Sequence, residues 1–505
     1  MSQFSEGDAA ITRLTAATDA FEKVLTEPEG TIVPMPVGQP QPSLAERLKR
    51  ALDAVTVQPA QAAAQAEAAA QQALQSAAAA AQSAADASNS AAATGYVDAP
   101  FPDVWAPLSD SLQLLAGSAP ADMLTIGGTS YPLKTKSISF TRATTATYID
   151  KTGALQTAVI NEARFEKEGL LIEGVSTNLF LNSSDPSKWG NSALLSKTQQ
   201  NDGSTQAMTG VFTASSDISN AANIITNTAN PVALSAGGQL SGSCNAKSSY
   251  GRLRFRVQRV SGEEVANCVV DLTTGQLTPA SNIALVATLK SDGYYRVEAT
   301  FTATDADNYV VQFRYIPASG SSIIPQGSVI YLQMPQLEVG GVSSYIPTTD
   351  STVTRGEDVA NLTAINGGLD NATIACTVTR KWTPTSPPNS APRIFSTRGG
   401  VAGSAWDAAF NNTGSANSFG GQTNSGALVA GFVDGQVFTS IKTPAGLTTM
   451  TPAGKNAGSQ TTSPGFVSPL YLGNTKELNR PLFGHIRNLR IWHSVLSDIQ
   501  IKGLR

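Results

Sequence analysis

The chain has 505 residues, of which 14% are charged and 43 are glycine, and its formal net charge is −4 at pH 7. This length exceeds that of one ordinary domain, so we expect several folding units. The low charge and the many small polar residues are typical of β-rich extracellular or virion-type proteins. The near-neutral balance excludes a global field that would recruit nucleic acid or an anionic membrane.

The N-terminus lacks the basic segment and apolar run of a signal peptide, and no stretch of about 18 apolar residues predicts membrane insertion. We therefore expect synthesis in a cytosol and no membrane insertion. Three cysteines, Cys244, Cys268 and Cys376, are widely spaced and match no metal-ligand pattern. Because a cytosol is reducing, we expect these cysteines to be buried thiols and not to form a disulfide.

The first 42 residues combine an amphipathic helix with a proline-rich segment. Ile11, Leu14, Phe21 and Leu25 share one helical face, which predicts a short helix that begins near Asp8 and stops before the first proline of the next segment. Five prolines in residues 28–42 remove backbone donors and hold the chain extended. This segment either lies across the surface of another protein or serves as a flexible linker.

Residues 43–95 predict a helical stalk. Ser43 and Glu46 have the spacing of a capping box, and 20 of the 34 residues from 60 to 93 are alanine. Because alanine is the best helix former, we predict a rod of roughly 50 Å. Alanine buries little apolar area, so the rod should pair with further copies of the chain as a coiled coil. The alternative is a disordered low-complexity linker.

Residues 96–175 predict a collar followed by a β-rich coupler. Prolines and large apolar side chains alternate over residues 96–120, and Gly127-Gly128 is a hairpin signal between two apolar runs. From Ile138 onward, β-branched and aromatic residues alternate with small polar ones. We expect this segment to turn the chain from the stalk into the sandwiches.

The middle of the chain carries a candidate binding face. Apolar and polar side chains alternate over residues 252–259, 294–301 and 309–315, which predicts half-buried strands. Guanidinium and phenol groups bind saccharides that carry carboxylate or phosphate. The alternative is that the arginines solvate the open face or pair with Glu263, Glu264 and Glu298. The predicted glycan-binding residues of this face are Arg252, Arg254, Arg256, Tyr294, Arg296, Gln312 and Arg314.

The C-terminal region adds two candidate sugar-stacking residues, Trp382 and Trp406, which lie near loops rich in Gly, Asn and Ser. Trp492 belongs to a predicted closing strand and is expected in the core. The two histidines, His485 and His493, form no readable Ser-His-Asp order and no metal signature. We therefore predict no catalytic residue, no metal and no cofactor, although a depolymerase would use paired carboxylates.

Six short runs, each present once, follow one another along the chain. They are ISFTRA from Ile138, NEARF from Asn161, GLLIEG from Gly169, DGYYRV from Asp292, SYIPT from Ser344 and TRGED from Thr354. Together they resemble the segment found in bacteriophage tail fibre and tail spike proteins, where it leads into a carbohydrate-binding-module-like sandwich. Tyr294 stands where that family often has tryptophan, and TRGED replaces a more usual Thr-Arg-Ala-Ala-Asp. The ending, FGHIRNLRIWH from Phe483 and LSDIQIKGL from Leu496, is similar to laminin-G and concanavalin-A-like sandwiches.

The resemblance implies a mostly β fold in five segments. These are a virion-attachment segment over 1–42, a helical Ala-rich stalk over 43–95, a collar and coupler over 96–175, a carbohydrate-binding-module-like β-sandwich over 176–354, and a laminin-G/concanavalin-A-like jelly-roll sandwich over 355–505.

The resemblance also implies a role. It implies a lectin-like, homotrimeric tail fibre component of the virion that contacts tail or portal-adaptor proteins through residues 1–42. Its sandwiches would bind a host surface polysaccharide or lipopolysaccharide during host attachment. The alternative is a tail spike enzyme that degrades or deacetylates that polysaccharide.

Overall fold

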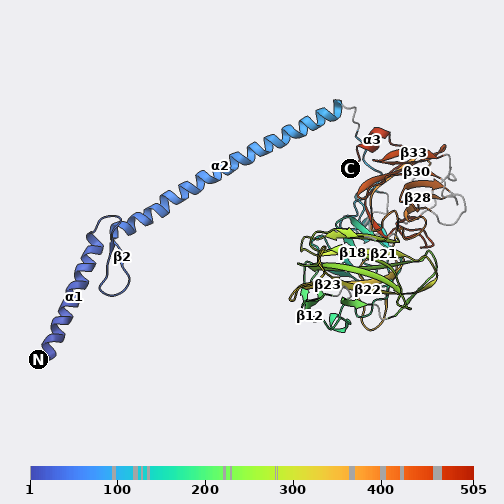
Figure 1. Ribbon diagram of the computed structural model, residues 1–505. Helices are drawn as coiled ribbons and strands as arrows, with labels where there is room; N and C mark the ends of the chain where they lie inside the picture. Colours follow the sequence, from blue (N-terminus) through green and yellow to red (C-terminus); the bar gives the residue numbers. More distant parts are fainter. Residues whose placement is uncertain are drawn as a thin grey trace. The chain divides into compact units, whose positions relative to one another are not determined.

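The chain folds into two compact units, Met1–Val97 and Asp98–Arg505 (Figure 1). The first is helical and the second is built from β-sheets. The computed structural model describes residues 2–93, 98–117, 123–126, 129–132, 137–219, 223–227, 230–278, 280, 282–362, 370–397, 405–420, 426–458 and 469–504.

The N-terminal unit contains α1 (Ser2–Thr26), the paired strands β1 (Ile32–Val33) and β2 (Gln41–Pro42), and α2 (Leu44–Ala93). The proline-rich segment thus forms a hairpin instead of staying extended, and Val33 within it is buried. The Oγ of Ser43 accepts a hydrogen bond from the backbone N–H of Glu46 (3.2 Å), as an N-cap should. The Glu46 carboxylate does not complete the predicted capping box, because it accepts from the N–H of Gly30 (3.0 Å).

The stalk sequence forms one continuous helix of 50 residues. Its apolar side chains lie exposed on the single chain, including Leu48, Leu52, Val55 and Leu74. The helical stalk is therefore present, whereas its association into a coiled coil stays a prediction. In the parts of the chain that the structure describes, no helix combines the length and apolar character needed to cross a membrane.

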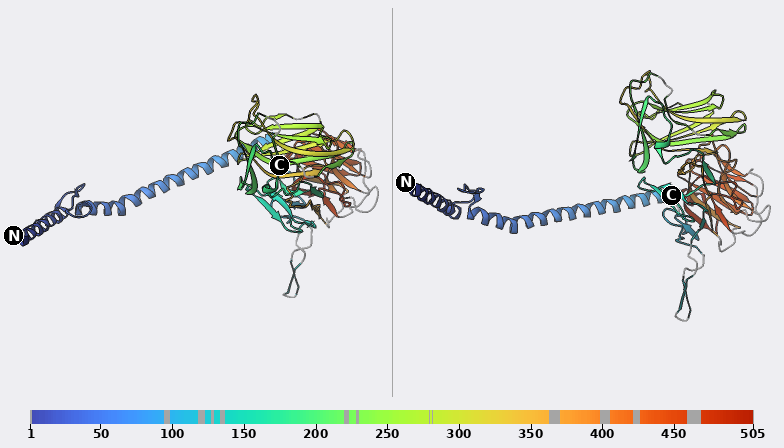
Figure 2. Two further views of the ribbon diagram at one scale, coloured as in Figure 1. Left: turned by 60° about the horizontal axis from the view of Figure 1, so that its bottom comes forward. Right: turned by 90° about the horizontal axis from the view of Figure 1, so that it is seen from below.

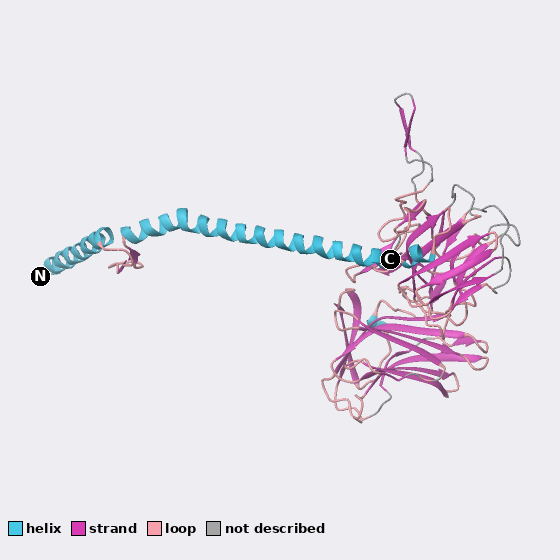
Figure 3. Cartoon of the chain, turned by 90° about the horizontal axis from the view of Figure 1, so that it is seen from above, coloured by secondary structure: helices cyan, strands magenta, loops and turns pink. Residues whose placement is uncertain are grey.

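The middle sandwich packs two antiparallel sheets face to face (Figure 3). Its aromatic core includes Trp189, Phe212, Phe301 and Phe313. Within the described residues, one sheet has the order β12 (Leu195–Asp202), β13 (Ala207–Ala214), β23 (Val329–Val339), β16 (Gln239–Ser248), β21 (Tyr295–Thr302), β20 (Ile283–Leu289). The other has the order β14 (Asn223–Asn227), β22 (Asp307–Ile316), β17 (Arg252–Arg259), β18 (Glu264–Asp271), β19 (Leu277–Thr278), with β15 (Val232–Leu234) also paired to β22.

The second sandwich combines strands from both ends of the β-rich unit. Its first sheet, as far as it is described, runs β33 (Gly454–Gly458), β32 (Gly446–Thr451), β31 (Gln436–Thr443), β26 (Ala372–Arg380), β35 (Gly484–Trp492), β10 (Gly169–Ile172), β9 (Phe165–Glu166), and β3 (Val104–Ala106) also pairs with β35. Its second sheet runs β30 (Ala427–Val429), β29 (Ala416–Gly420), β28 (Trp406–Phe410), β27 (Arg393–Ser396), β34 (Leu470–Leu472), β25 (Val359–Leu362), β6 (Ser139–Thr141).

This topology makes the middle sandwich an insertion. The strands β3, β6, β9 and β10 precede it in the sequence, yet they complete the C-terminal sheets and share their core (Figure 2). The segment 96–175, expected to be a separate collar and coupler, therefore contributes to the sandwich that was expected to begin at residue 355. The chain enters and leaves the insertion through β11 (Ser176–Asn178) and β24 (Val353–Arg355), which pair with each other. We call this crossing the neck.

Smaller elements complete the β-rich unit. The predicted hairpin is present as β4 (Met123–Ile126) and β5 (Thr129–Pro132), while its Gly127-Gly128 turn lies outside the described residues. A second hairpin pairs β7 (Ala146–Ile149) with β8 (Leu155–Ala158). The chain also has a 3-10 turn, η1 (Pro186–Lys188), and a final short helix, α3 (Asp498–Lys502), which Ser497 caps.

A buried ion cluster lies at the neck. Asp358 accepts hydrogen bonds from Arg142 (3.1 Å) and Arg164, and Glu173 lies 2.9 Å from Arg164 and 3.4 Å from Arg355. All five side chains are at most 1% exposed. Burial would raise the pKa of Glu173, but the charges of Arg355 and Arg164 outweigh burial and lower it. The cluster therefore joins segments up to 216 residues apart.

Candidate functional site

The predicted binding face is partly assembled on the outer side of β17 and β22. These strands are neighbours, and their register places Arg254 opposite Arg314 and Arg256 opposite Gln312. Phe255 and the other alternate residues of β17 point into the core. The side chains of Arg252, Arg254, Arg256, Gln312 and Arg314 therefore share one surface, which we call the arginine face.

Within the described residues, two of the four arginines of this face are paired with a carboxylate, and both use Glu264. Arg254 and Arg256 each lie 2.5 Å from an oxygen of Glu264, which gives partial support to the alternative that these arginines pair with acids. Arg314 donates a hydrogen bond to the amide oxygen of Gln312 (2.6 Å), and Arg252 donates one to the backbone carbonyl of Pro317. Burial, and then the charges of Arg256 and Arg254, lower the pKa of Arg314. Positive charge is thus in excess on this face.

Two other residues predicted for this face lie elsewhere. Arg296 belongs to β21 in the opposite sheet, where it pairs with Glu298 (3.1 Å). Tyr294 is fully buried, and its hydroxyl donates to Asp202 (2.8 Å) while the ammonium of Lys247 sits 4.4 Å from the ring centroid. The expectation of a tyrosine platform for a sugar is corrected, because the phenol is satisfied inside the protein.

The two candidate tryptophans pack in the C-terminal core. Trp406 is 2% exposed and its indole N–H donates to the Oγ of Ser440 (2.8 Å). Trp382 is 9% exposed and donates to the carbonyl of Leu482 (2.7 Å). Neither presents a ring face for sugar stacking, so this expectation is also corrected. Trp492, expected in the core, is buried there.

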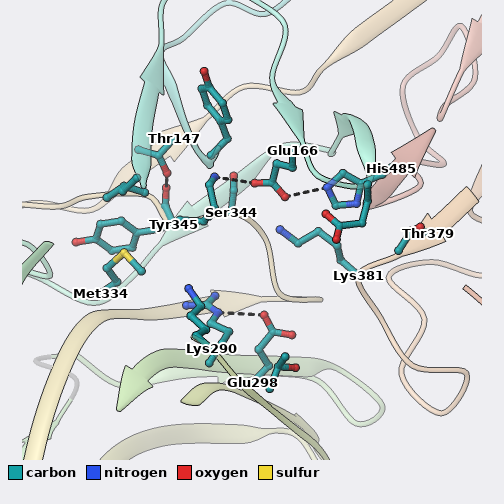
Figure 4. A pocket seen from close by; sticks show the side chains of 16 residues that line it. Thr147, Glu166, Lys290, Glu298, Met334, Ser344, Tyr345, Thr379, Lys381 and His485 are labelled. Atoms are coloured by element: carbon teal, nitrogen blue, oxygen red, sulfur yellow. Dashed lines mark hydrogen bonds and ion pairs between the residues drawn. The ribbon is translucent and has the colours of Figure 1, made fainter. Parts of the chain in front are cut away.

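Sequence reasoning missed a cavity of about 360 Å³ between the two sandwiches. One wall carries Glu166, Lys381 and His485 from the C-terminal sandwich, and the other carries Lys290 and Glu298 from the inserted one (Figure 4). Aromatic and apolar side chains lie between the walls. The lining comprises Thr147, Tyr148, Ile149, Leu155, Glu166, Glu168, Thr288, Lys290, Arg296, Glu298, Met334, Ser344, Tyr345, Thr379, Lys381 and His485.

The C-terminal wall is a network of coupled charges. The Nε2 of His485 lies 2.8 Å from an oxygen of Glu166, so the proton of this bond must sit on Nε2 because a carboxylate only accepts. Burial would raise the pKa of Glu166, but Lys381 and His485 outweigh burial and lower it to about 2. Burial alone would lower the pKa of Lys381, whereas the charges of Glu166 and Glu173 raise it.

The opposite wall holds one cation without an acid partner. Arg296 pairs with Glu298, but no carboxylate of the described residues lies within ion-pair distance of Lys290. Burial, and then the charge of Arg296, lower the pKa of Lys290 to about 8. Cations therefore stand on both walls, and their shared cavity can receive an anionic group.

Glu166, Glu168 and His485 also have the composition of a metal site, since their ligand atoms lie within 4.8 Å of one another. Among the groups that lower the pKa of Glu166, the charge of the Lys381 ammonium has the largest effect. A metal ion here would have to compete with this fixed positive charge, so the residues present fit a metal poorly.

The quoted runs contribute to this cavity without singling it out: Arg296 belongs to DGYYRV, Tyr345 to SYIPT and His485 to FGHIRNLRIWH. Its charged residues come from β9, from the ends of β20, β26 and β35, and from β21, which lie far apart along the chain. A further signal was the rarity of histidine, because His485 is one of two.

The comparisons with known proteins assign no family. No protein-family model and no curated protein sequence matches the chain. Among solved structures, domains LG4-5 of the mouse laminin alpha1 chain are similar over 52% of this chain and 85% of that chain, with 12% identity and a TM-score of 0.19. A TM-score this low carries no argument about fold or function.

Proposed function

We propose that this chain is a structural component of a bacteriophage tail fibre in the virion and that it attaches to the host by binding an anionic surface glycan. The observation that carries the proposal is the arginine face. Of the four guanidinium groups on this face, those of Arg254 and Arg256 have an ion-paired carboxylate among the described residues, and both use Glu264. Arg252 and Arg314 donate to uncharged oxygens instead. Guanidinium forks match the carboxylate or phosphate groups of acidic polysaccharides and lipopolysaccharides.

Weak individual contacts suffice for such a role if several copies act together. The exposed apolar residues of α2, such as Leu48 and Leu52, need cover from water, and parallel copies of the same helix would provide it. We propose a homotrimer on this basis and on the resemblance described above. Three arginine faces on one fibre would multiply the strength of a single face.

The N-terminal residues are proposed to dock on the virion. Ile11, Leu14 and Phe21 of α1 are each more than 60% exposed and lie on one side of the helix. The hairpin of residues 28–42 folds next to the start of α2, since Ser43 bonds the carbonyl of Pro28 (2.9 Å). A tail or portal-adaptor protein would cover the apolar side of α1 formed by Ile11, Leu14 and Phe21.

Binding of the full chain to purified bacterial surface polysaccharides tests the main claim. We expect retention of carboxylate- or phosphate-bearing polymers, weakening at high salt, and loss of about 10- to 100-fold in affinity for Arg314→Gln, because one charge-assisted hydrogen bond contributes about 1.5–3 kcal/mol. Arg487→Glu, an exposed arginine of β35 in the other sandwich, is the matched control. Equal affinity of wild type and Arg314→Gln would remove the arginine face as the site.

The same incubation separates binding from the enzymatic alternative. Polymer that keeps its length and its acetyl groups, together with saturable binding, supports a tail fibre. Shortened or deacetylated polymer would instead favour a tail spike enzyme. Sedimentation of the full chain tests the trimer, and a monomer at micromolar concentration would contradict it.

A further inference from the structure

We propose that the cavity between the sandwiches is a second saccharide site, which binds one acidic sugar unit by its carboxylate between Lys290 and Lys381. The two lysines belong to different sandwiches, so the ligand would bridge them (Figure 4). This site is separate from the arginine face and does not depend on it.

The first argument is the uncompensated charge of Lys290. The groups that act on it are Arg296 on its own wall, Asp292 in the adjoining turn, and Glu166 and Lys381 from across the cavity. None of the described carboxylates approaches within ion-pair distance, and burial already disfavours its charge. A cation that is partly desolvated but unpaired is typical of a binding site, because a ligand anion can supply the missing partner.

The second argument is the position of Lys381. In Figure 4 its side chain extends from the wall of Glu166 and His485 into the space that faces Lys290 and Glu298. Its nearest acid is Glu173 at 3.8 Å, which also belongs to the ion cluster at the neck. An anion placed between the two lysines would therefore meet positive charge from both walls.

The acids of the cavity select a sugar over a simple anion. Glu166 accepts from the N–H of Ile149 (2.9 Å) and contacts His485, and Glu298 pairs with Arg296. The remaining lone pairs of these carboxylates can accept hydrogen bonds from hydroxyl groups. A sugar carries several hydroxyl groups, whereas acetate has none and phosphate has at most two at neutral pH. Neutral polyols would satisfy the acids but leave Lys290 unpaired. A ligand that carries both an anionic group and hydroxyls, as an acidic sugar does, satisfies both.

The size and lining fit a small sugar. A cavity of 360 Å³ stands near the lower end of the range of about 300–1,000 Å³ for small-molecule sites. Met334, Tyr148 and Tyr345 line it with apolar and aromatic surface, on which the C–H faces of a pyranose can pack. One or two sugar units, but not a polymer segment, should enter.

Calorimetric titration of the full chain tests the site. The probes are glucuronate, galacturonate and N-acetylneuraminate, with glucose and inorganic phosphate as comparisons. We expect at least one acidic sugar to bind at least ten times more tightly than glucose or phosphate. Its affinity should fall as the pH rises through about 8, where Lys290 loses its proton. No binding by any acidic sugar at about 10 mM would overturn the proposal, and equal binding of phosphate would overturn the assignment to a sugar.

Variants assign the binding to the cavity. Lys290→Gln should weaken the best acidic sugar by about 10- to 100-fold, as expected for loss of one charge-assisted hydrogen bond, and Lys290→Arg should retain most of the affinity. Lys188→Gln, an exposed lysine of the same sandwich, is the control. Arg314→Gln should leave the binding of the acidic sugar to the cavity unchanged. The proposal for the arginine face and the proposal for this cavity can therefore be refuted separately. Unchanged affinity in a folded Lys290→Gln variant would overturn the proposal.

Discussion

Removal of the charge of Asp358 should destabilise the β-rich unit severely. Asp358 is fully buried, and its two oxygens accept from Arg142 (3.1 Å), from Arg164 and from the backbone N–H of Glu173 (2.9 Å). In Asp358→Asn one oxygen becomes an amide group that faces donors. Among the described residues Arg142 then loses its ion-paired acid, while Arg164 and Arg355 keep Glu173. Loss of one partner from a buried ion pair costs about 3–5 kcal/mol, and we expect the variant to fall in this range.

Urea unfolding followed by intrinsic fluorescence measures this loss. The matched control is Asp350→Asn, since Asp350 is exposed and its change should stay within about 0.5 kcal/mol. The midpoint of Asp358→Asn should shift strongly to lower urea, with loss of the C-terminal sandwich and the neck. A difference below about 1 kcal/mol between the two variants would show that the cluster does not stabilise the neck.

Three further predictions concern titratable groups. Lys290→Met should stabilise the protein by up to about 3 kcal/mol at pH 7, because the pKa of Lys290 is about 8 in the folded state against an ordinary value of 10.5, and each pKa unit corresponds to about 1.4 kcal/mol. The gain should shrink as the pH rises from 8 to 10.5, measured by urea midpoints. The pKa of Glu166 is lowered from 4.5 to about 2, so its contribution is complete above pH 4.5 and is lost as the pH falls toward 2; Glu166→Gln should flatten the decline of stability in this window. Burial raises the pKa of Cys244, Cys268 and Cys376 to about 12, so a thiol reagent at pH 8 should react only after denaturation, and rapid reaction of the native protein would contradict their burial.

The sequence was sufficient to predict three strands of the inserted sandwich, β17, β21 and β22. Alternation placed Leu253, Phe255 and Val257 in the core and the intervening arginines on the other side, as observed. It could not show which strands become neighbours, because the period of two is the same in either sheet. Arg296 was therefore grouped with Arg314, although their strands lie in opposite sheets.

The insertion was also beyond reach of the sequence pattern. The strands that complete the C-terminal sandwich from its N-terminal side, such as β6 and β9, have only two to four residues. Runs this short carry little periodicity, and the partners that β6 and β10 find in the C-terminal segment lie more than 200 residues away. The order of the segments along the chain suggested consecutive domains. The boundaries of the C-terminal sandwich are instead set by strand pairs that cross the inserted sandwich, such as β6 with β25 and β10 with β35.

The recognised runs and the proposed binding sites have different physical requirements. A buried arginine needs a specific acid in a fixed place, so ISFTRA, NEARF, GLLIEG and TRGED each supply one or more members of the same cluster. Gly169 in one of these runs has φ +124, and an added Cβ would lie 2.7 Å from the carbonyl of Ile486, so close strand packing requires glycine there. By contrast, Arg314 needs only a position on an accessible strand face, and Lys290 needs only a position in the cavity wall with no fixed ion-pair partner among the described residues. The runs that carry the resemblance thus supply the ion cluster at the neck, and their presence predicts architecture more firmly than it predicts the ligand.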